Sequence, residues 1–261
     1  MALHPESVDV LGYALSAVSW AQALELIEEW AQERQSRFAC LCNTHVMMTA
    51  RSNVRLDRAI RQADLVLPDG MPIALLMRVG KHRDQQRIAG ADLMWRYCGK
   101  AESSGQSIFL LGGTPHTLEL LRLRLHAAFP ALAIAGYYSP PFRPMSESED
   151  RHVTDIINGS GAHTVFVGLG CPKQEIWMSE HRGLINAVML GVGAAFDFHA
   201  GLIPRAPAWM QNIGMEWLHR LIREPKRLWH RYLTTNFQFL AVFFWRGLLR
   251  RGTAKARRHK A

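Results

Sequence analysis

The chain has 261 residues, of which 48% are hydrophobic and 20% are charged, so it predicts a globular protein with ample material for a buried core and excludes a disordered chain. The net charge of +9 is unevenly spread, because residues 1–204 hold 18 Lys and Arg against 20 Asp and Glu, and residues 205–261 hold 13 against 2. We therefore expect an α/β body over 1–204 and a basic appendage over 205–261 with an anionic partner.

Neither the cysteines nor the N-terminus indicates export or membrane insertion. The four cysteines show no metal-ligand spacing and predict free, mostly buried thiols in a reducing cytoplasm: Cys40, Cys42, Cys98 and Cys171. The first residues lack the basic and apolar regions of a signal peptide. No apolar run approaches the roughly 20 residues that a membrane span requires. A cytoplasmic body is expected.

Strands alternate with helices along the body in the pattern of apolar residues. The expected strands are one or two within 8–18, then 38–42, 65–67, 107–111, 131–135, 164–167 and 187–190. The expected helices cover 20–33, 46–62, 71–79, 93–102, 116–129, 150–158 and a segment ending at 181, with loops at 80–86 and 137–149. This alternation predicts a Rossmann-like α/β fold with a mostly parallel, doubly wound sheet, followed by a basic helical appendage.

The apolar run that ends in Pro68-Asp69-Gly70 is the most informative stretch. A buried parallel strand of this kind delivers a carboxylate to the edge of the sheet where ligands bind in α/β proteins. Pro68 ends the strand and Gly70 allows the tight turn that points Asp69 outward. An isolated Pro-Asp-Gly is more often a simple turn or helix cap, so this interpretation depends on the rest of the chain.

Glycine pairs follow three of the predicted strands, at Gly112-Gly113, Gly168/Gly170 and Gly191/Gly193. Glycine lets backbone N–H groups approach a phosphate at a helix N-terminus. None of the three turns has the complete G-x-G-x-x-G fingerprint, and strand-to-helix turns favour glycine for structural reasons alone. Three such turns on one sheet edge nevertheless favour a nucleotide. Lys173 and Gln174, where the next helix starts, suit a phosphate or a base edge.

A set of short motifs, taken together and in their order along the chain, resembles the WecG/TagA/CpsF glycosyltransferase family over roughly residues 8–245. The matching residues in the body are Asn43, Ala-Asp-Leu-Val-Leu-Pro-Asp69-Gly70, Arg87-x-x-Gly90-x-Asp92, Leu-Leu-Gly112-Gly113, Val-Gly168-Leu-Gly170-x-Pro172-Lys-Gln174-Glu175 and Gly191-Val-Gly193-x-x-Phe196-Asp197. Those in the appendage are Arg205-Ala-Pro207, Gly214-x-Glu216-Trp217-x-x-Arg220 and Glu224-Pro225-x-Arg227-Leu228.

The resemblance implies inverting transfer of a sugar from a UDP-sugar to a polyprenyl-diphosphate-linked saccharide at the inner membrane face. Members act in the synthesis of teichoic acid linkage units, enterobacterial common antigen and exopolysaccharide, with N-acetylmannosamine, its uronic acid or glucose as the sugar. They need no Asp-x-Asp metal site, and here Asp197-Phe-His199 is the nearest approach to one. The resemblance thus implies no metal and no cofactor besides the donor.

The same resemblance assigns the site residues. Asp69 would be the general base that deprotonates the acceptor hydroxyl, with His45 as second candidate. Asn43 would hold a sugar hydroxyl, although Leu41 stands where members often carry Thr. Arg87 would serve either the departing diphosphate or, equally, Asp92. The UDP-sugar would be bound by Gly112, Gly113, Gly168, Gly170, Lys173, Gln174 and Asp197. Gln174 and Glu175 resemble the nucleotide-contacting pair of the family, but for Glu175 a first-turn carboxylate that favours the helix dipole is the simpler explanation.

The appendage mixes aromatic and basic residues, as an anionic membrane interface requires. Its arginines are also candidates to bind the diphosphate of the acceptor: Arg220, Arg223, Arg227 and Arg231. The apolar segment Phe237–Trp245 is too short to span a bilayer. A core helix with a solvated basic face remains an alternative for residues 206–222. We expect peripheral attachment to the inner face of the membrane.

Two other classes of protein fit the sequence less well. A Rossmann-type nicotinamide-dependent oxidoreductase should carry a complete glycine fingerprint and an acidic residue at the end of the second strand, where Asn43 stands. A nucleic-acid binder would leave Asp69 and the glycine turns without a purpose. The sequence does not indicate which of the three sugars is transferred, and it is compatible with a homo-oligomer.

Overall fold

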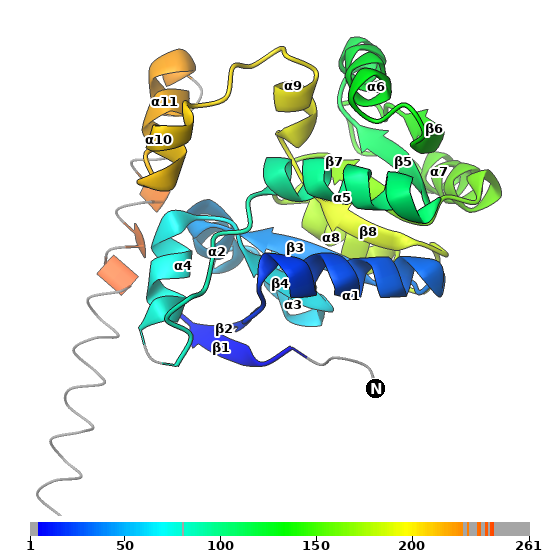
Figure 1. The fold of residues 1–261 in the computed structure, drawn as a ribbon. Helices are drawn as coiled ribbons and strands as arrows, with labels where there is room; N and C mark the ends of the chain where they lie inside the picture. The colour runs from blue at the N-terminus through cyan, green and yellow to red at the C-terminus, as the bar shows by residue number, and fades with distance from the viewer. Residues whose placement is uncertain are drawn as a thin grey trace, which may run out of the picture.

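A six-stranded, fully parallel sheet with the strand order β4-β3-β8-β7-β5-β6 forms the centre of the body (Figure 1). The computed structural model describes residues 5–79, 81–226, 229, 234–235, 238–239 and 241–242. The strands are β3 (Phe38–Cys42), β4 (Leu65–Pro68), β5 (Ser107–Gly112), β6 (Ala133–Tyr138), β7 (Thr164–Gly168) and β8 (Val188–Gly191). The predicted Rossmann-like parallel sheet is confirmed.

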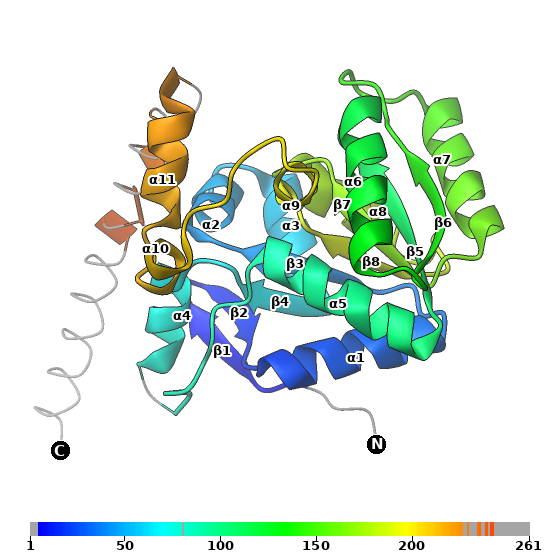
Figure 2. The same cartoon turned by 45° about the horizontal axis from the view of Figure 1, so that its top comes forward.

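Helices cover both faces of this sheet, which makes the fold doubly wound (Figure 2). One face packs against α1 (Trp20–Gln32), α5 (Gly90–Ser104), α6 (Pro115–Ala128) and α9 (Ala195–His199). The other packs against α7 (Glu147–Ser160) and α8 (Lys173–Glu180), with α2 (Thr44–Ala50) and α3 (Val54–Gln62) toward β4. In β3 all five residues are buried, with Ala39 in one core and Phe38 in the other, as expected for a central parallel strand.

A short antiparallel hairpin precedes the sheet and consists of β1 (Ser7–Val10) and β2 (Tyr13–Ser16). Its two turn residues, Leu11 and Gly12, both have positive φ, at 55° and 97°. A two-residue turn of this kind matches the right-handed twist of the flanking strands. The hairpin packs beside β4, where Ser16 Oγ accepts a hydrogen bond from the Val66 N–H at 3.1 Å.

Some element boundaries differ from the sequence prediction because side-chain caps outweigh the apolar period. The single helix expected over 46–62 is two helices, α2 and α3, because Asn53 caps α3 by accepting from the Leu56 N–H at 3.1 Å. Helix α7 begins within the expected loop, where Ser146 and Glu149 form a capping box. The expected strand 131–135 lies at Ala133–Tyr138. All four cysteines are free, and three are buried, as predicted.

The basic segment continues from α9 through an extended connection into α10 (Ala208–Asn212) and α11 (Glu216–Arg223). Figure 1 shows these two helices beside α4 (Met71–Arg78), at the end of the sheet that carries β4. The contact is close, since a Cβ placed on Gly214 would lie 2.7 Å from the Cβ of Met71. Within the described part of the chain, no helix has both the length and the apolar character needed to cross a membrane.

Gly112 is required where β5 passes β7. It has a φ of +123°, and a Cβ there would lie 2.6 Å from the backbone of Gly168. We predict that Gly112→Ala lowers the free energy of unfolding by about 2 kcal/mol or more, because strain and overlap add. Gly159→Ala is the control: it lies within α7 with nothing within 4 Å of the new Cβ, and should raise stability by about 0.5–1 kcal/mol. Urea denaturation measures both, and equal effects would contradict the assignment.

Candidate active site

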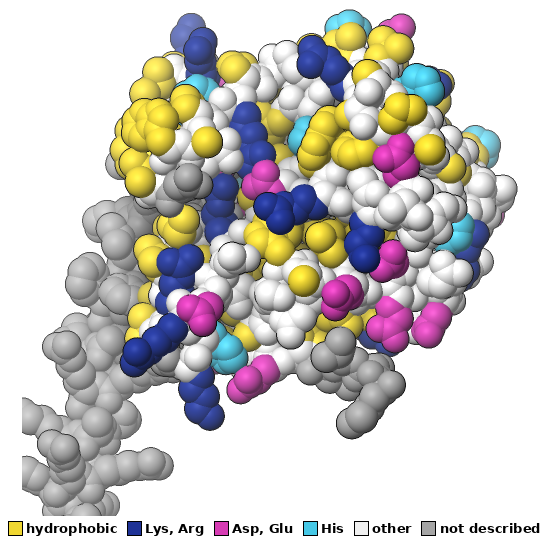
Figure 3. Space-filling model, in the orientation of Figure 1, with side chains coloured by type: hydrophobic (Ala, Val, Ile, Leu, Met, Phe, Trp, Pro, Cys, Tyr) yellow, Lys and Arg dark blue, Asp and Glu magenta, His cyan; other side chains and the backbone are white. Residues whose placement is uncertain are grey.

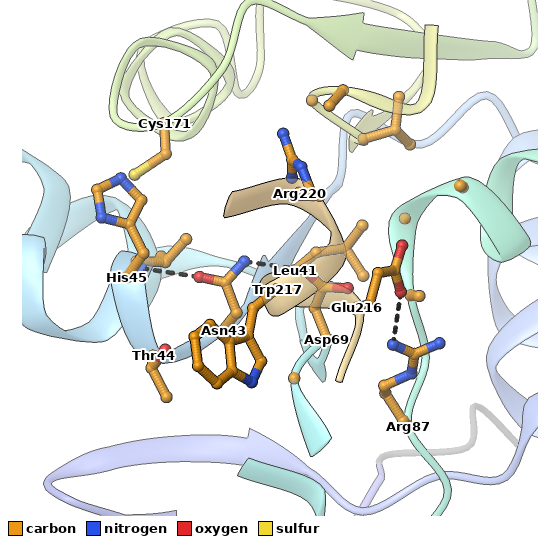
Figure 4. A pocket seen from close by; sticks show the side chains of 18 of the residues that line it. Leu41, Asn43, Thr44, His45, Asp69, Arg87, Cys171, Glu216, Trp217 and Arg220 are labelled. Atoms are coloured by element: carbon orange, nitrogen blue, oxygen red, sulfur yellow. Dashed lines mark hydrogen bonds and ion pairs between the residues drawn. The ribbon is translucent and has the colours of Figure 1, made fainter. Parts of the chain in front are cut away.

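A cavity of about 640 Å³ lies at the carboxyl ends of β4, β3, β8 and β7. The carboxyl ends of parallel strands are where α/β proteins bind ligands, and the cavity lies at this edge of the sheet. Helix α11 and the loop before it form one wall of the cavity, so the basic segment takes part in the site (Figure 4). In Figure 3, acidic and basic side chains gather at the hollow between the α10–α11 segment and the rest of the body.

Asn43 and Asp69 meet at the floor of the cavity because β3 and β4 are in parallel register. Cys42 is aligned with Pro68, so the next residue of each strand emerges at the same level. Asn43 Nδ2 donates to Asp69 Oδ2 at 2.9 Å, and Asn43 Oδ1 accepts from the Val46 N–H at 3.1 Å, which caps α2. Because the helix occupies the amide oxygen, the amide presents its N–H group to the carboxylate.

The surroundings of Asp69 hold its carboxyl in a state suited to accept a proton. Burial raises the pKa of Asp69 above its usual value, and the negative charge of Glu216 acts in the same direction. The hydrogen bond from Asn43, the charge of Arg87 and the N–H of Gly90 oppose this shift. Gly90 is the first residue of α5, so the positive end of that helix faces the carboxylate. The result is a fixed carboxylate with a higher proton affinity than an ordinary surface aspartate.

A network of four charged side chains joins α11 to the body. Arg87 Nη1 lies 2.8 Å from Glu216 Oε2 and Arg87 Nη2 lies 3.9 Å from Asp92 Oδ2. Arg205 forms two hydrogen bonds to Asp92, at 2.5 and 2.7 Å, and its Nε lies 3.6 Å from Glu216 Oε1. Although burial favours the protonated form, Arg205 and Arg87 hold the pKa of Asp92 below its usual value. Arg87 therefore pairs with both carboxylates, and with Glu216 more closely.

Arg220 supplies a cationic group to the cavity from α11. Its guanidinium carbon lies 5.4 Å from the centroid of the Phe198 ring, and it makes no ion pair with any residue that the structure describes. In Figure 4 it projects over the cavity above Asn43 and Asp69. A guanidinium group that is held by an aromatic ring and has no carboxylate partner is suited to bind an anionic ligand.

Some of the residues expected at the site line this cavity and others do not. Seven of them line it: Asn43, His45, Asp69, Arg87, Gly170, Gln174 and Arg220. Six lie outside its lining: Gly112, Gly113, Gly168, Lys173, Asp197 and Arg223. Arg227 and Arg231 fall outside the described residues, so their expected role stays a prediction. Figure 4 shows the His45 ring directed toward Cys171, with Asn43 between His45 and Asp69.

The glycines outside the cavity have packing roles of their own. Gly112 lets β5 approach β7, and a Cβ on Gly113 would lie 3.3 Å from Thr117. Lys173 instead directs its Nζ to the carbonyl oxygen of Phe142, at 3.4 Å. Their assignment to the diphosphate therefore stays a prediction. Gly170 does line the cavity, has a φ of +76° and leaves open space beside its Cα.

Residues that the sequence interpretation left without a role also belong to this site. Glu216 and Trp217 line the cavity from α11. Gly90 lines it from the start of α5, and Arg205 lines it from the connection between α9 and α10. All four stand in the motifs of the ordered set, but their pairings are tertiary, and nothing in the local sequence indicates which carboxylate meets which guanidinium group. Among the described residues, no three His, Cys, Asp or Glu side chains are grouped so as to hold a metal ion.

A fixed carboxylate and cationic groups line a cavity at the carboxyl edge of a doubly wound sheet, where proteins of this fold class bind ligands. The chain matches the Glycosyl transferase WecG/TagA/CpsF family model over residues 8–253. It is 31% identical over 214 residues to an N-acetylglucosaminyldiphosphoundecaprenol N-acetyl-beta-D-mannosaminyltransferase of Bacillus spizizenii strain W23, with 82% of this chain and 81% of the relative covered. The chain belongs to the WecG/TagA/CpsF glycosyltransferase family, which confirms the resemblance and makes the protein an enzyme.

The charged network predicts that Glu216 keeps α11 on the body. Glu216→Gln removes the carboxylate that pairs with both Arg87 and Arg205, and these side chains are mostly buried. We therefore expect the free energy of unfolding to fall by about 1–3 kcal/mol. Trypsin should also cut faster after Arg205. The matched control is Glu180→Gln, which breaks an exposed ion pair with Arg55 and should change stability by less than about 0.5 kcal/mol. Equal trypsin sensitivity of the two variants would contradict the role of Glu216.

Proposed function

We propose that the enzyme transfers N-acetylmannosamine from its UDP-sugar to a polyprenyl-diphosphate-linked N-acetylglucosamine, with inversion and without a metal ion. The observation that best supports this proposal is that Asn43 holds the carboxylate of Asp69 by a hydrogen bond at the floor of a cavity that Arg220 also lines. The name of the relative supports the sugar and the acceptor, since it describes transfer of an N-acetylmannosaminyl group to N-acetylglucosaminyldiphosphoundecaprenol. Such a reaction serves the synthesis of cell-surface polymers such as teichoic acid or exopolysaccharide.

The reaction is a direct displacement. A hydroxyl oxygen of the acceptor attacks the anomeric carbon, and the bond from that carbon to the β-phosphate oxygen breaks with its electron pair left on UDP. The hydroxyl proton passes to the carboxylate of Asp69, whose raised proton affinity suits a general base. Asn43 keeps the carboxylate in place by donating to Oδ2.

The negative charge that develops on the leaving diphosphate needs cationic groups or N–H donors. Arg220 lies on the cavity side of α11, and the turn at Gly170 comes directly before α8. A helix N-terminus presents unpaired N–H groups, so this turn is suited to an anion. These groups are proposed to perform the task that a metal ion performs in other transferases.

The direct test is a UDP-release assay with three donors and one acceptor. UDP-N-acetylmannosamine, UDP-N-acetylmannosaminuronic acid and UDP-glucose are offered with a short-chain polyprenyl-diphosphate-N-acetylglucosamine, with and without EDTA. We expect acceptor-dependent release from the first donor, unchanged by EDTA. Release of UDP from only one of the other two donors would show that a different sugar is transferred. Thermal stabilisation by NAD but not by UDP would favour the oxidoreductase alternative.

Asp69→Asn should lower the rate of transfer by about 10²–10⁴-fold, because the amide cannot accept the proton. The amide keeps the size of the carboxyl, so the affinity for UDP should stay within a few-fold of the wild type. Single-turnover transfer and UDP titration measure the two quantities. Near-normal transfer would exclude Asp69 as the base, and His45 would then be the residue to substitute.

Asn43→Ser should move the acidic limb of kcat/KM to higher pH. The Asn43 amide stabilises the charged form of Asp69, so removing it raises the pKa of Asp69, and the base is then protonated at a higher pH. Serine is itself a good helix cap, so α2 should remain folded. Asn53→Ser is the matched control, because Asn53 caps α3 in the same way without touching a catalytic group. An acidic limb at the same pH in Asn43→Ser and Asn53→Ser would contradict the role of Asn43 in setting the pKa of Asp69.

The basic appendage is proposed to attach the enzyme peripherally to the inner face of the membrane and to help bind the lipid diphosphate. Trp209 and Ile213 on and beside α10 are 63% and 61% exposed, and Figure 3 shows hydrophobic side chains gathered there. Each basic residue near an anionic leaflet contributes on the order of 1 kcal/mol. The full chain should therefore sediment with phosphatidylglycerol vesicles at low salt and be released at high salt. A chain that ends at Glu224 keeps Trp209 and Ile213 but loses most of the basic residues of the appendage, so it should not sediment. Release by detergent alone would contradict peripheral attachment.

A further inference from the structure

Glu175 is a buried carboxyl that the proposed chemistry does not use. It lies in the first turn of α8 with 0% of its surface exposed, so it is not the solvated helix-start residue that its position suggests. Its Oε1 accepts a hydrogen bond from Gln174 Nε2 at 2.7 Å, and its Oε2 has no hydrogen-bond partner among the described residues. Burial raises the pKa of Glu175. The Gln174 amide, the backbone N–H of Glu175 and the Cys171 side chain oppose this shift. A carboxyl is costly to bury, so its short hydrogen bond with Gln174 calls for an explanation.

That contact fixes the side-chain amide of Gln174, which lines the cavity although it is only 5% exposed. Gln174 Oε1 accepts from the Gly170 N–H at 3.2 Å, and Nε2 donates to Glu175. A backbone N–H can only donate, so it requires the oxygen of the amide on its side, and Glu175 accepts from the nitrogen on the other. The two contacts together select one of the two orientations of the amide.

The packing around this amide leaves it little freedom to turn. A Cβ on Gly191 would lie 3.2 Å from Gln174 Nε2, and one on Gly193 would lie 3.5 Å from Gln174 Oε1. Glycine at both positions therefore lets the end of β8 close over the side chain. The amide still has one N–H and one lone pair to offer, and Gln174 lines the cavity. An amide held in this way suits a ligand edge that carries both an acceptor and a donor, as the uracil ring of UDP does.

We propose that Glu175 is a positioning residue for the nucleotide: through its 2.7 Å hydrogen bond it holds the Gln174 amide in the orientation that contacts the uracil ring of the donor. This inference rests on the proposed UDP-sugar specificity. Glu175 itself touches no substrate and acts through Gln174. Its burial beneath the cavity, rather than at the surface of α8, is what this task requires.

The test is calorimetric titration of UDP into the wild-type protein and variants of Glu175. Glu175→Met removes the acceptor at similar size and should raise the Kd for UDP by about three- to ten-fold, the usual effect of one neutral hydrogen bond. Glu175→Asp shortens the side chain by one methylene, so it should weaken binding similarly, and it replaces the Met variant should that fail to fold. Glu175→Gln retains an acceptor oxygen and should bind UDP within two-fold of the wild type.

A double-mutant cycle separates positioning from packing. In a Gln174→Ala background, Glu175→Met should have no further effect on the Kd for UDP, and in the wild-type background it should raise KM for the donor while kcat is retained. Equal effects in both backgrounds, or a lowered melting temperature with unchanged UDP affinity, would overturn the inference. A wild-type protein that binds no UDP would contradict the proposed function as well, whereas normal wild-type binding with unaffected variants would overturn this inference alone.

Discussion

The hydrogen bond between Asn43 and Asp69 is the interaction on which the site depends. It exists because β3 and β4 are parallel neighbours in register, which brings the residues that follow Cys42 and Pro68 to the same level. The same asparagine caps α2, so the strand, the helix and the carboxylate are fixed by one side chain. The N-terminus of α5 then faces the carboxylate through Gly90. A carboxylate held by three elements is preorganised, as the proposed role of Asp69 as general base requires.

Around this fixed centre the charges are arranged in pairs. Arg87 and Arg205 are neutralised by Glu216 and Asp92, which join α11 to the body and make the basic segment a wall of the cavity. Arg220 lines the cavity from α11 and, among the described residues, makes no ion pair. Of the cationic side chains that line the cavity, Arg87 and Arg205 thus contact carboxylates and Arg220 contacts an aromatic ring.

The sequence was sufficient for the sheet, because central parallel strands are continuous apolar runs. It also placed Asp69 directly after β4, although Pro-Asp-Gly alone does not distinguish a functional carboxylate from a turn or helix cap. It could not decide the role of Gly112 and Gly113, since glycine serves both phosphate contact and close packing: Gly112 packs against the backbone of Gly168 and Gly113 against Thr117, and their contact with a diphosphate stays a prediction. The pairing of Arg87 with Glu216 joins residues 129 positions apart, which no local pattern indicates. Glu175 has the sequence position of a surface helix-start residue, and only the tertiary structure shows that it is buried.

The central claim is a direct displacement at the anomeric carbon with Asp69 as the single base. The configuration at that carbon, followed by NMR through one turnover with a donor labelled with ¹³C at the anomeric position, tests it most directly. A one-step attack from the face opposite UDP requires that the one-bond carbon–hydrogen coupling of the product corresponds to the opposite anomer from the donor. A product with the anomeric configuration of the donor would require two displacements and a nucleophile on the enzyme, and would contradict this account.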